Sequence, residues 1–413
     1  MPHVIGRAAA CLEHKSAVVP AYGRPVRLCV INSHPIQYFA PLYAYVSQDV
    51  ALELTAIYCS DFSLRMATDP GFNQVVAWDI DLLAGYKSVF VAGNHERTPR
   101  GFWSLVCPQL WSEIRSDRYD VVLLHGYSYA ATVIAFLAAR TKNIPILMRS
   151  ETHLGLRRNE FKRFVRDSAL RIAYRFVDGF LAIGSNNRDY YRALGVPSHK
   201  IFDVPYAVDN DRFIAPSSGD HRASLRRKYR LPDDQPIVLY ASKFIQRKHP
   251  DDLIRAMAML RDRGCIAALF MVGSGVMEQE LRDLARSLGL TNVTFAGFVN
   301  QREMPDIYSV ADVFVLPSDN EPWGLVINEV MCAGLPVVVS DEVGCVADLV
   351  KDGVNGYHAK VGDPLSLAKA VGKLLASRDA RAAMGAASLR IIRQWSYDQC
   401  LQGMKAAVAA VVR

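Results

Sequence analysis

One stretch of the chain, VLPSDNEPWGLVINEVMCAGLPVVVS at residues 315–340, decides the fold. Its apolar start predicts a buried strand that ends at Pro317, and the polar segment that follows carries Glu321. A helix is expected to begin near Gly324, and the Gly-Leu-Pro at 334–336 stops this helix and starts the next strand. A strand, a loop, a helix and another strand in this order are typical of a parallel α/β sheet.

The same alternation extends outward from this stretch. From residue 26 onward, short β-branched runs alternate with segments of helical period, which predicts parallel sheets covered by helices. The expected strands are 26–31, 52–58, 121–124, 144–148, 180–183 and 201–204, then 237–240, 267–272, 293–295, 313–316 and 337–339. The expected helices include 250–262, 277–288, 325–333 and 365–376. A turn-rich stretch at 209–220 separates the two series.

The fold class expected from this pattern is α/β, with two doubly wound, Rossmann-like domains that face each other across a cleft. The length of 413 residues suits more than one domain. The expected boundaries are a disordered leader at 1–25, an N-terminal domain at 26–205, a C-terminal domain at 206–392 and a last helix at 393–413. That helix has few charges, so it is expected to pack back on the N-terminal domain.

Composition and charge limit the class of protein. The chain is 51% hydrophobic and 22% charged, as folded globular chains are. Its net charge of +7 is too small for a polyanion binder, so no nucleic acid partner is expected. Residues 1–205 carry 23 basic and 17 acidic side chains, so the excess lies in the first half and any acidic partner is expected there.

Cysteine spacing and hydropathy point to a cytoplasmic protein. The eight cysteines show no CxxC or Cys/His ligand spacing, so they are expected to be reduced core residues without zinc. No run of 18 apolar residues occurs, and the first two dozen residues lack the apolar core of a signal peptide. We expect a chain that is at most attached to the inner face of a membrane.

Two carboxylates stand where a ligand would bind. Ligands of open α/β sheets lie beyond the carboxyl ends of the strands, and Glu321 follows such an end. Glu329 lies inside the helix, where it can accept hydrogen bonds from vicinal hydroxyls. The backbone amides of Gly324 and Leu325 at the helix start can hold a phosphate. This layout suits a nucleotide-sugar, although the spacing alone also fits a solvated loop glutamate and an exposed helix glutamate.

Six segments in order resemble motifs of the retaining GT-B glycosyltransferases of family 4, also called glycosyl transferases group 1. Residues 321–329 resemble the E-x7-E signature of that family, with its continuation to Pro336. The others are similar to its IPNGVDxxxF, GRLxxxKG, IVGxG, VxFxGxV and DGxNG motifs, and lie at 204–213, 241–249, 271–275, 293–299 and 352–356. The resemblance implies the GT-B fold, a nucleoside-diphosphate sugar donor and transfer with retention of configuration.

The resemblance also assigns roles in the C-terminal domain, which would bind the donor. Diphosphate contacts fall on Lys248 and on Lys243, which replaces the usual arginine and lacks the two-pronged geometry of a guanidinium. Glu321 would contact the transferred sugar and act in catalysis, Glu329 would bind the ribose hydroxyls, and the loop at Phe298 would hold the base. The implied donor-binding set is Lys243, Lys248, Gly273, Phe298, Glu321, Gly324, Leu325 and Glu329.

The N-terminal domain, on the acceptor side, departs from many relatives. It reads SHPIQY at 33–38 where they carry a Gly-Gly pair, and it resembles a subset with this loop and with WDxxLLxGY, here at 78–86. The acceptor-side residues implied are His34, Gln37 and Tyr38. His153 follows the strand 144–148 and matches a position near the reaction centre of relatives, so it is expected to act as a phosphate contact or proton relay. A purely structural hydrogen bond is the alternative.

No metal and no cofactor are expected. Two D-x-D triplets, at 79–81 and 209–211, resemble a metal motif of another glycosyltransferase fold, but about one such match arises by chance in a chain of this composition. Lys243, Lys248 and the helix start near Gly324 can neutralise a leaving diphosphate without a cation.

Residues 157–175 form a basic amphipathic helix in this interpretation. The segment has seven basic and two acidic residues, and Phe161, Val165, Ile172 and Phe176 share one side at helical spacing. An ordinary domain helix with a solvated basic face is one interpretation. The other is a surface that rests on anionic lipid and brings the enzyme to a lipid-linked acceptor.

The function expected is that of a retaining, metal-independent hexosyltransferase. It would move a sugar from UDP or GDP to a hydroxyl of a lipid-linked glycan or cell-surface polysaccharide precursor. The alternatives are a nucleotide-sugar 2-epimerase of similar fold and a non-catalytic sugar-nucleotide-binding protein. The E-x7-E spacing speaks against the first alternative, and the retained Glu321, Lys243 and Lys248 speak against the second.

Overall fold

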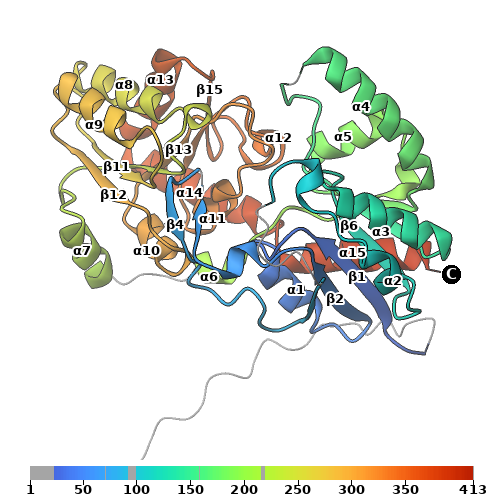
Figure 1. Cartoon of the computed structure of the whole chain (residues 1–413). Coiled ribbons are helices and arrows are strands. Elements are labelled where there is room, and N and C mark those ends of the chain that lie inside the picture. Colours follow the sequence, from blue (N-terminus) through green and yellow to red (C-terminus); the bar gives the residue numbers. More distant parts are fainter. Residues whose placement is uncertain (1–22, 70, 92–98, 158, 215–218, 413) are drawn as a thin grey trace, which may run out of the picture.

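The computed structural model describes residues 23–69, 71–91, 99–157, 159–214 and 219–412. These residues form two α/β domains that lie side by side in Figure 1. Each domain is built on one parallel sheet, and a third sheet is a small antiparallel hairpin. The predicted fold class is therefore confirmed. Residues 1–22 of the expected leader lie outside the described residues.

The first domain has seven strands in the order β5-β2-β1-β6-β7-β8-β9. In chain order they are β1 (Val26–Asn32), β2 (Leu52–Tyr58), β5 (Lys87–Phe90), β6 (Val121–His125), β7 (Ile146–Arg149), β8 (Gly179–Ala182) and β9 (Ile201–Asp203). The central strands are buried along almost their whole length, because helices cover both faces of a parallel sheet. The helices of this domain are α1 (Ala40–Val46), α2 (Leu110–Ile114), α3 (Ala130–Thr141), α4 (Glu160–Ala173) and α5 (Ser185–Ala193).

The second domain has six strands in the order β12-β11-β10-β13-β14-β15. They are β10 (Ile237–Ala241), β11 (Ala268–Val272), β12 (Val293–Gly297), β13 (Val313–Leu316), β14 (Val337–Ser340) and β15 (Gly356–Ala359). The helices between 210 and 392 are α6 (Asn210–Ile214), α7 (Gly219–Lys228), α8 (Pro250–Arg261), α9 (Glu278–Ser287), α10 (Met304–Ser309), α11 (Val326–Cys332), α12 (Val346–Leu349), α13 (Pro364–Leu375) and α14 (Arg378–Ile392).

Every predicted strand forms, with ends that differ by two residues at most. The prediction missed β5 and β15, which are edge strands of the two sheets. An edge strand has one neighbour only, so polar residues such as Lys87 and His358 interrupt its apolar run. It also missed the hairpin of β3 (Ala67–Asp69) and β4 (Gln74–Val76), whose strands are too short to show a period.

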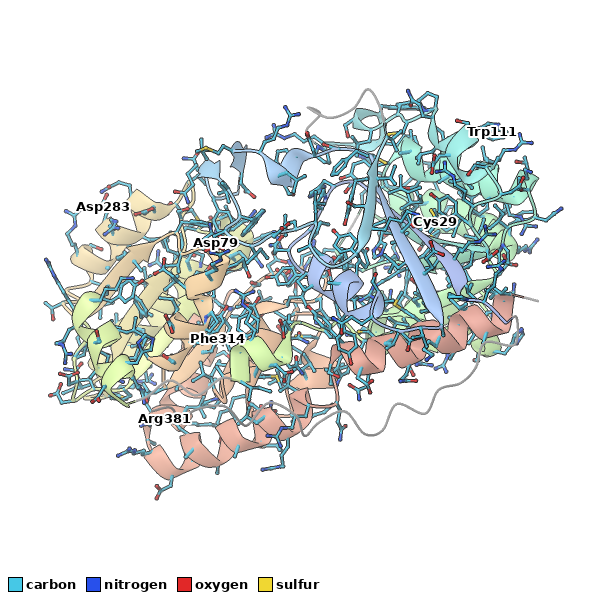
Figure 2. All side chains as sticks on the ribbon, turned by 90° about the horizontal axis from the view of Figure 1, so that it is seen from below. Cys29, Asp79, Trp111, Asp283, Phe314 and Arg381 are labelled. Atoms are coloured by element: carbon cyan, nitrogen blue, oxygen red, sulfur yellow. The ribbon has the colours of Figure 1, made fainter. Side chains whose placement is uncertain are left out.

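The last helix, α15 (Tyr397–Val411), leaves the second domain and packs on β8, β9 and α1 of the first (Figures 1 and 2). Lys405 Nζ lies 2.9 Å from Asp49 Oδ2. A Cβ on Gly403 would lie 1.8 Å from the carbonyl oxygen of Asp203, so a glycine is required for the helix to approach β9 this closely. The C-terminal helix therefore ties the two domains together.

Two further sequence-based expectations concern the chain as a whole. Six of the seven cysteines in the described ranges are buried, in agreement with the predicted core role. Across the same ranges, no helix has the length and apolar character that crossing a bilayer would require.

Candidate active site

A cavity of about 450 Å³, the interdomain cavity, lies between the two domains. Its walls come from the loop after β1 and the hairpin region of the first domain, and from the loops after β10, β11 and β13 of the second. These loops meet because each follows the carboxyl end of a parallel strand. All but one of the predicted site residues line it: His34, Gln37, Tyr38, Lys243, Lys248, Gly273, Phe298, Glu321, Gly324, Leu325 and Glu329. The exception is His153.

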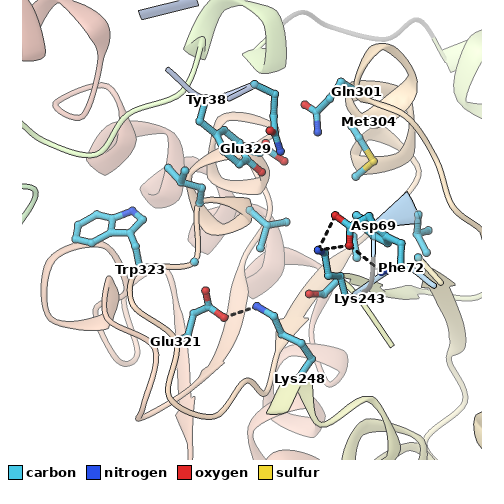
Figure 3. A pocket seen from close by; sticks show the side chains of 18 of the residues that line it. Tyr38, Asp69, Phe72, Lys243, Lys248, Gln301, Met304, Glu321, Trp323 and Glu329 are labelled. Carbon is cyan, nitrogen blue, oxygen red and sulfur yellow. Dashed lines mark hydrogen bonds and ion pairs between the residues drawn. The ribbon is translucent and has the colours of Figure 1, made fainter. Parts of the chain in front are cut away.

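Glu321 lies in the loop between β13 and α11. Its backbone is held by Gly344, whose N–H donates to the Glu321 carbonyl oxygen at 2.9 Å. The Glu321 carboxylate is ion-paired with Lys248 Nζ (Figure 3) and with Arg247 Nη1, the latter at 3.0 Å. The Glu321 and Lys248 side chains are only 12% and 10% exposed, so little water screens this pair.

Glu329 lies in α11 and is buried. Its Oε2 accepts a hydrogen bond from the Tyr308 hydroxyl, and the Tyr38 side chain approaches the same carboxylate from the first domain (Figure 3). Oε1 is also buried and has no hydrogen-bond partner within the described ranges. Burial raises the pKa of Glu329 to about 7. Oε1 is thus a buried acceptor of a residue that lines the cavity.

Lys243 faces a partner that the sequence analysis missed. Its Nζ lies 2.9 and 3.1 Å from the two carboxylate oxygens of Asp69, at the end of β3, and 4.5 Å from the centre of the Phe72 ring. Hydrogen bonds from Lys243 and from backbone amides lower the pKa of Asp69, although burial opposes them. Asp69 comes from the first domain, so this ion pair joins the two domains across the cavity.

The hairpin of β3 and β4 makes further contacts with the second domain. Ser274 Oγ donates to the Phe72 carbonyl oxygen at 2.9 Å, and Asn300 Nδ2 donates to the Ala77 carbonyl oxygen at 2.6 Å. The Trp78 ring lies 6.4 Å from the ring of Phe298. Trp78 therefore contacts the second domain, and it also lines the interdomain cavity.

Gly273 and Phe298 lie together beyond β11 and β12. Gly273 has φ +137°, and a Cβ there would lie 2.0 Å from the carbonyl oxygen of Ser242, so no other residue fits at this position. The Phe298 ring contacts the Phe72 ring edge to face at 4.9 Å. The second domain thus offers both a close backbone approach and an aromatic surface.

His153 does not line the interdomain cavity. Its Nδ1 accepts a hydrogen bond from the Gly155 N–H at 3.2 Å, so Nε2 carries the proton and faces the Glu321 carbonyl oxygen at 3.5 Å. Burial lowers the pKa of His153. His34 lines the cavity beside Phe62, and burial lowers its pKa to about 4. The His34 imidazole is therefore neutral at pH 7.

Three of the four aspartates in the two D-x-D triplets, Asp79, Asp81 and Asp209, accept hydrogen bonds from backbone N–H groups. Asp79 accepts from the Arg302 N–H at 3.2 Å, and Asp209 accepts from the Arg212 N–H at 3.3 Å. Over the described part of the chain, the one group with three metal-ligating side chains close together is His249, Asp251 and Asp252 at the start of α8. It lies outside the interdomain cavity lining, and metal independence stays a prediction.

Several residues of the site were missed from sequence. Asp69 and Tyr308 had no detectable signal, because their roles arise from contacts with distant segments. Glu151 follows β7 and lines the cavity, and its Oε1 accepts from the Tyr206 hydroxyl at 2.6 Å. The rule that ligands bind beyond carboxyl strand ends could have found Glu151.

Two facing Rossmann-like domains with a cavity at their carboxyl strand ends define the GT-B class. The family model described as "Glycosyl transferases group 1" matches residues 221–390, and that described as "Glycosyl transferase 4-like domain" matches residues 70–207. The alpha-D-kanosaminyltransferase of Streptomyces kanamyceticus is 30% identical over 62% of this chain and 68% of its own. The chain belongs to the glycosyl transferases group 1 family.

Two other curated relatives have an inositol phosphate or a phosphatidylinositol in their names. The D-inositol 3-phosphate glycosyltransferase of Xylanimonas cellulosilytica is 34% identical over 52% of each chain. The GDP-mannose-dependent alpha-(1-6)-phosphatidylinositol monomannoside mannosyltransferase of Mycobacterium tuberculosis is 33% identical over 57% of this chain and 62% of its own. The chain spans about half to two thirds of the length of these relatives.

Solved structures share the fold over nearly the whole chain. Anabaena HepE in complex with UDP and glucose has a TM-score of 0.70 at 16% identity, covering 93% of this chain and 100% of its own. Sucrose-phosphate synthase from Thermosynechococcus elongatus has a TM-score of 0.67 at 19% identity, covering 92% and 97%. At these identities the likeness shows the fold.

Proposed function

We propose that the protein is a retaining hexosyltransferase that moves a sugar from a nucleoside diphosphate to an acceptor hydroxyl. One observation carries this proposal: Lys243, Arg247 and Lys248 line a single cavity together with Glu321 and Glu329. Cations beside carboxylates suit a ligand that presents both phosphates and sugar hydroxyls. A hydrolase would instead need two carboxylates that flank the bond.

In this mechanism the diphosphate enters between Lys243 and Lys248. Lys243 then leaves Asp69, and Lys248 leaves Glu321, and both ammonium groups contact phosphate oxygens instead. The backbone at Gly324 and Leu325 lies in the same cavity. The two ammonium groups stabilise the negative charge that grows as the sugar leaves. Because these fixed cations are present, we propose that the transfer needs no metal ion.

Glu329 binds the nucleoside in this proposal. Its buried Oε1 accepts a hydrogen bond from a ribose hydroxyl, which supplies the partner that Oε1 lacks within the described residues. The base lies at Phe298. Glu321, freed from Lys248, accepts from a hydroxyl of the transferred sugar. His153 positions the loop that carries Glu321 through the Glu321 carbonyl oxygen.

The first domain holds the acceptor, next to His34, Gln37 and Tyr38. Helix α4 of this domain favours the proposal of a lipid-linked acceptor, because the apolar side of the helix faces outward. Phe161, Phe164 and Ile172 are 76%, 68% and 61% exposed, whereas Leu170 on the opposite side is buried. An ordinary domain helix would bury its apolar side.

The charges of α4 fit an anionic membrane. Lys162 and Arg171 are exposed and flank the apolar side, while Arg166 turns inward to Asp167 at 2.7 Å. Residue 158 lies outside the described residues. We therefore propose that α4 rests on the inner face of a membrane with its apolar side in the headgroup region, close to acceptors for polysaccharide synthesis.

A donor screen tests the proposed function. Purified protein is incubated with UDP and GDP sugars, with and without a membrane extract, and nucleoside diphosphate, free sugar and epimerised sugar are measured. We expect diphosphate release that the extract stimulates, with the anomeric configuration of the product retained. Sugar epimerisation without release would show a 2-epimerase, and binding without turnover would show a sensor.

A further inference from the structure

A second cavity of about 290 Å³, the first-domain cavity, lies beside the interdomain cavity. It is formed at the carboxyl ends of β1, β6 and β7, and it shares Glu151 and Pro322 with the interdomain cavity. Pro322 directly follows Glu321 in the chain. A ligand in the first-domain cavity would therefore reach toward the residue that we propose acts on the transferred sugar.

Arg149, the last residue of β7, lines the first-domain cavity and is 3% exposed. Its guanidinium lies over the rings of Phe39 and Tyr206, at 5.7 and 5.2 Å from their centres. Nε and Nη2 are buried and have no hydrogen-bond partner among the residues that the structure describes. Stacking on aromatic rings fixes the guanidinium plane but leaves these N–H groups unused.

The neighbouring titratable groups, Glu151 and His125, do not neutralise the positive charge of Arg149. The Glu151 carboxyl accepts from the Tyr206 hydroxyl, and across the described ranges its interaction with the Arg149 charge is electrostatic, without an ion pair within 4.0 Å. Burial raises the pKa of Glu151. His125 on β6 is neutral, because burial and the Arg149 charge lower its pKa to about 3. A buried cation with unused donors is unfavourable by itself and becomes favourable once an anion binds.

The remaining lining suits a ligand with hydroxyl groups. It includes the side chains of Asn32, Ser33, Tyr127 and Thr152, which donate and accept hydrogen bonds. Lys243, Arg247 and Lys248 line the interdomain cavity and not this one, so the donor diphosphate has cations of its own.

We propose that Arg149 binds an anionic group, a phosphate or a carboxylate, on a hydroxyl-bearing acceptor and so selects anionic acceptors. This inference rests on the proposed function, since the protein has an acceptor only if it transfers a sugar from a donor. The planar fork of a guanidinium matches two oxygens of such a group. The anion then anchors the acceptor in the first-domain cavity, while a free hydroxyl faces the donor sugar beside Glu321.

Calorimetry with UDP or GDP present tests the proposal, using glucose 6-phosphate and glucose as matched probes. We expect the wild type to bind the phosphorylated probe about tenfold more tightly or better, as a charge-assisted hydrogen bond implies. Arg149→Met should abolish this preference, and Arg149→Lys should retain part of it. Arg140→Met removes an arginine of α3 outside the cavity and should change nothing.

A second arm covers an anion that belongs to a lipid. Vesicles of phosphatidylcholine with and without phosphatidylinositol are compared for wild type and Arg149→Met, which share the same α4 surface. A greater loss of binding to the phosphatidylinositol vesicles in the variant would identify a lipid phosphate as the source.

The outcomes separate this inference from the proposed function. The inference is overturned if the wild type prefers neither glucose 6-phosphate over glucose nor vesicles with phosphatidylinositol over those without it. It is also overturned if Arg149→Met keeps such a preference. In either case, binding of UDP or GDP is measured before the probes are added, and it shows whether the protein has a donor site. Failure of both nucleotides to bind would instead refute the proposed function.

Discussion

Glu321 combines a role in turnover with an ion pair. Its carboxylate is paired with the mostly buried Lys248, so Glu321→Gln leaves that ammonium without its closest partner. We expect turnover to fall by about 10² or more. Thermal and urea unfolding should show a loss of about 3 kcal/mol in the free energy of unfolding. Nucleoside diphosphate should restore part of the stability, because the phosphate pairs with Lys248.

The matched control is Glu280→Gln, which changes an exposed glutamate of α9. It should leave turnover and unfolding unchanged. Wild-type turnover in Glu321→Gln, measured by diphosphate release, would sink the assignment of Glu321 to the reacting sugar.

Glu329 makes stability depend on pH. Its pKa in the fold, about 7, lies above its ordinary value of 4.5, so the folded state binds the proton more tightly. The resulting stabilisation is complete below pH 4.5 and is lost as the pH rises through 7, and it amounts to about 3 kcal/mol. Urea midpoints measured between pH 4.5 and 8 should show this fall in the wild type relative to Glu329→Gln. Parallel curves for the two proteins would contradict the shift.

At the scale of elements, the hairpin of β3 and β4 supplies Asp69, the ion-pair partner of Lys243. Lys243→Met removes a diphosphate contact and should weaken nucleoside diphosphate binding by about 1 to 3 kcal/mol. Asp69→Asn removes the competing carboxylate and should strengthen binding by up to about 1 kcal/mol, since the pair is partly exposed. Calorimetry of nucleoside diphosphate binding to both variants measures these changes in affinity. Weaker binding in Asp69→Asn would show that Asp69 positions Lys243 rather than competes for it.

The outward apolar side of α4 predicts binding to anionic vesicles that weakens at high salt. Sedimentation should show that Lys162→Glu combined with Arg171→Glu reduces this binding, and that Phe161→Ser combined with Phe164→Ser does so at any salt concentration. Arg140→Met serves as the control for lost charge. Equal binding of the wild type to neutral and anionic vesicles would leave α4 without a membrane role.

At the scale of the whole molecule, the loop after β10 of the second domain brings three cations to the interdomain cavity, and we propose that they take the place of a metal ion. Lys243, Arg247 and Lys248 lie in one cavity, so we expect diphosphate release to continue in the presence of EDTA. The assay compares untreated, EDTA-treated and Mn²⁺-supplemented protein. Activity that disappears with EDTA and returns with Mn²⁺ would contradict metal independence.

Both sheets could be predicted from the sequence, and so could the position in one cavity of the residues expected to bind the donor. Buried parallel strands are nearly continuous apolar runs, as at 313–316 and 337–339, so a local pattern reveals them. Glu321, Glu329 and Gly273 stand at strand ends or helix starts within short motifs. Their approximate places follow from the rule that ligands bind beyond carboxyl strand ends.

Only the tertiary structure decided which side chains meet across the domains. Asp69 reaches Lys243 over 174 positions of sequence, and Tyr38 approaches Glu329 from the other domain. No local period records such contacts, because they depend on how one sheet is placed against the other. The amphipathic pattern of α4 was visible in the sequence, but whether its apolar side packs inward or faces outward depends on the surface beneath it. The buried, unpartnered guanidinium of Arg149 likewise arises from packing, since its aromatic neighbours come from separate segments of the chain.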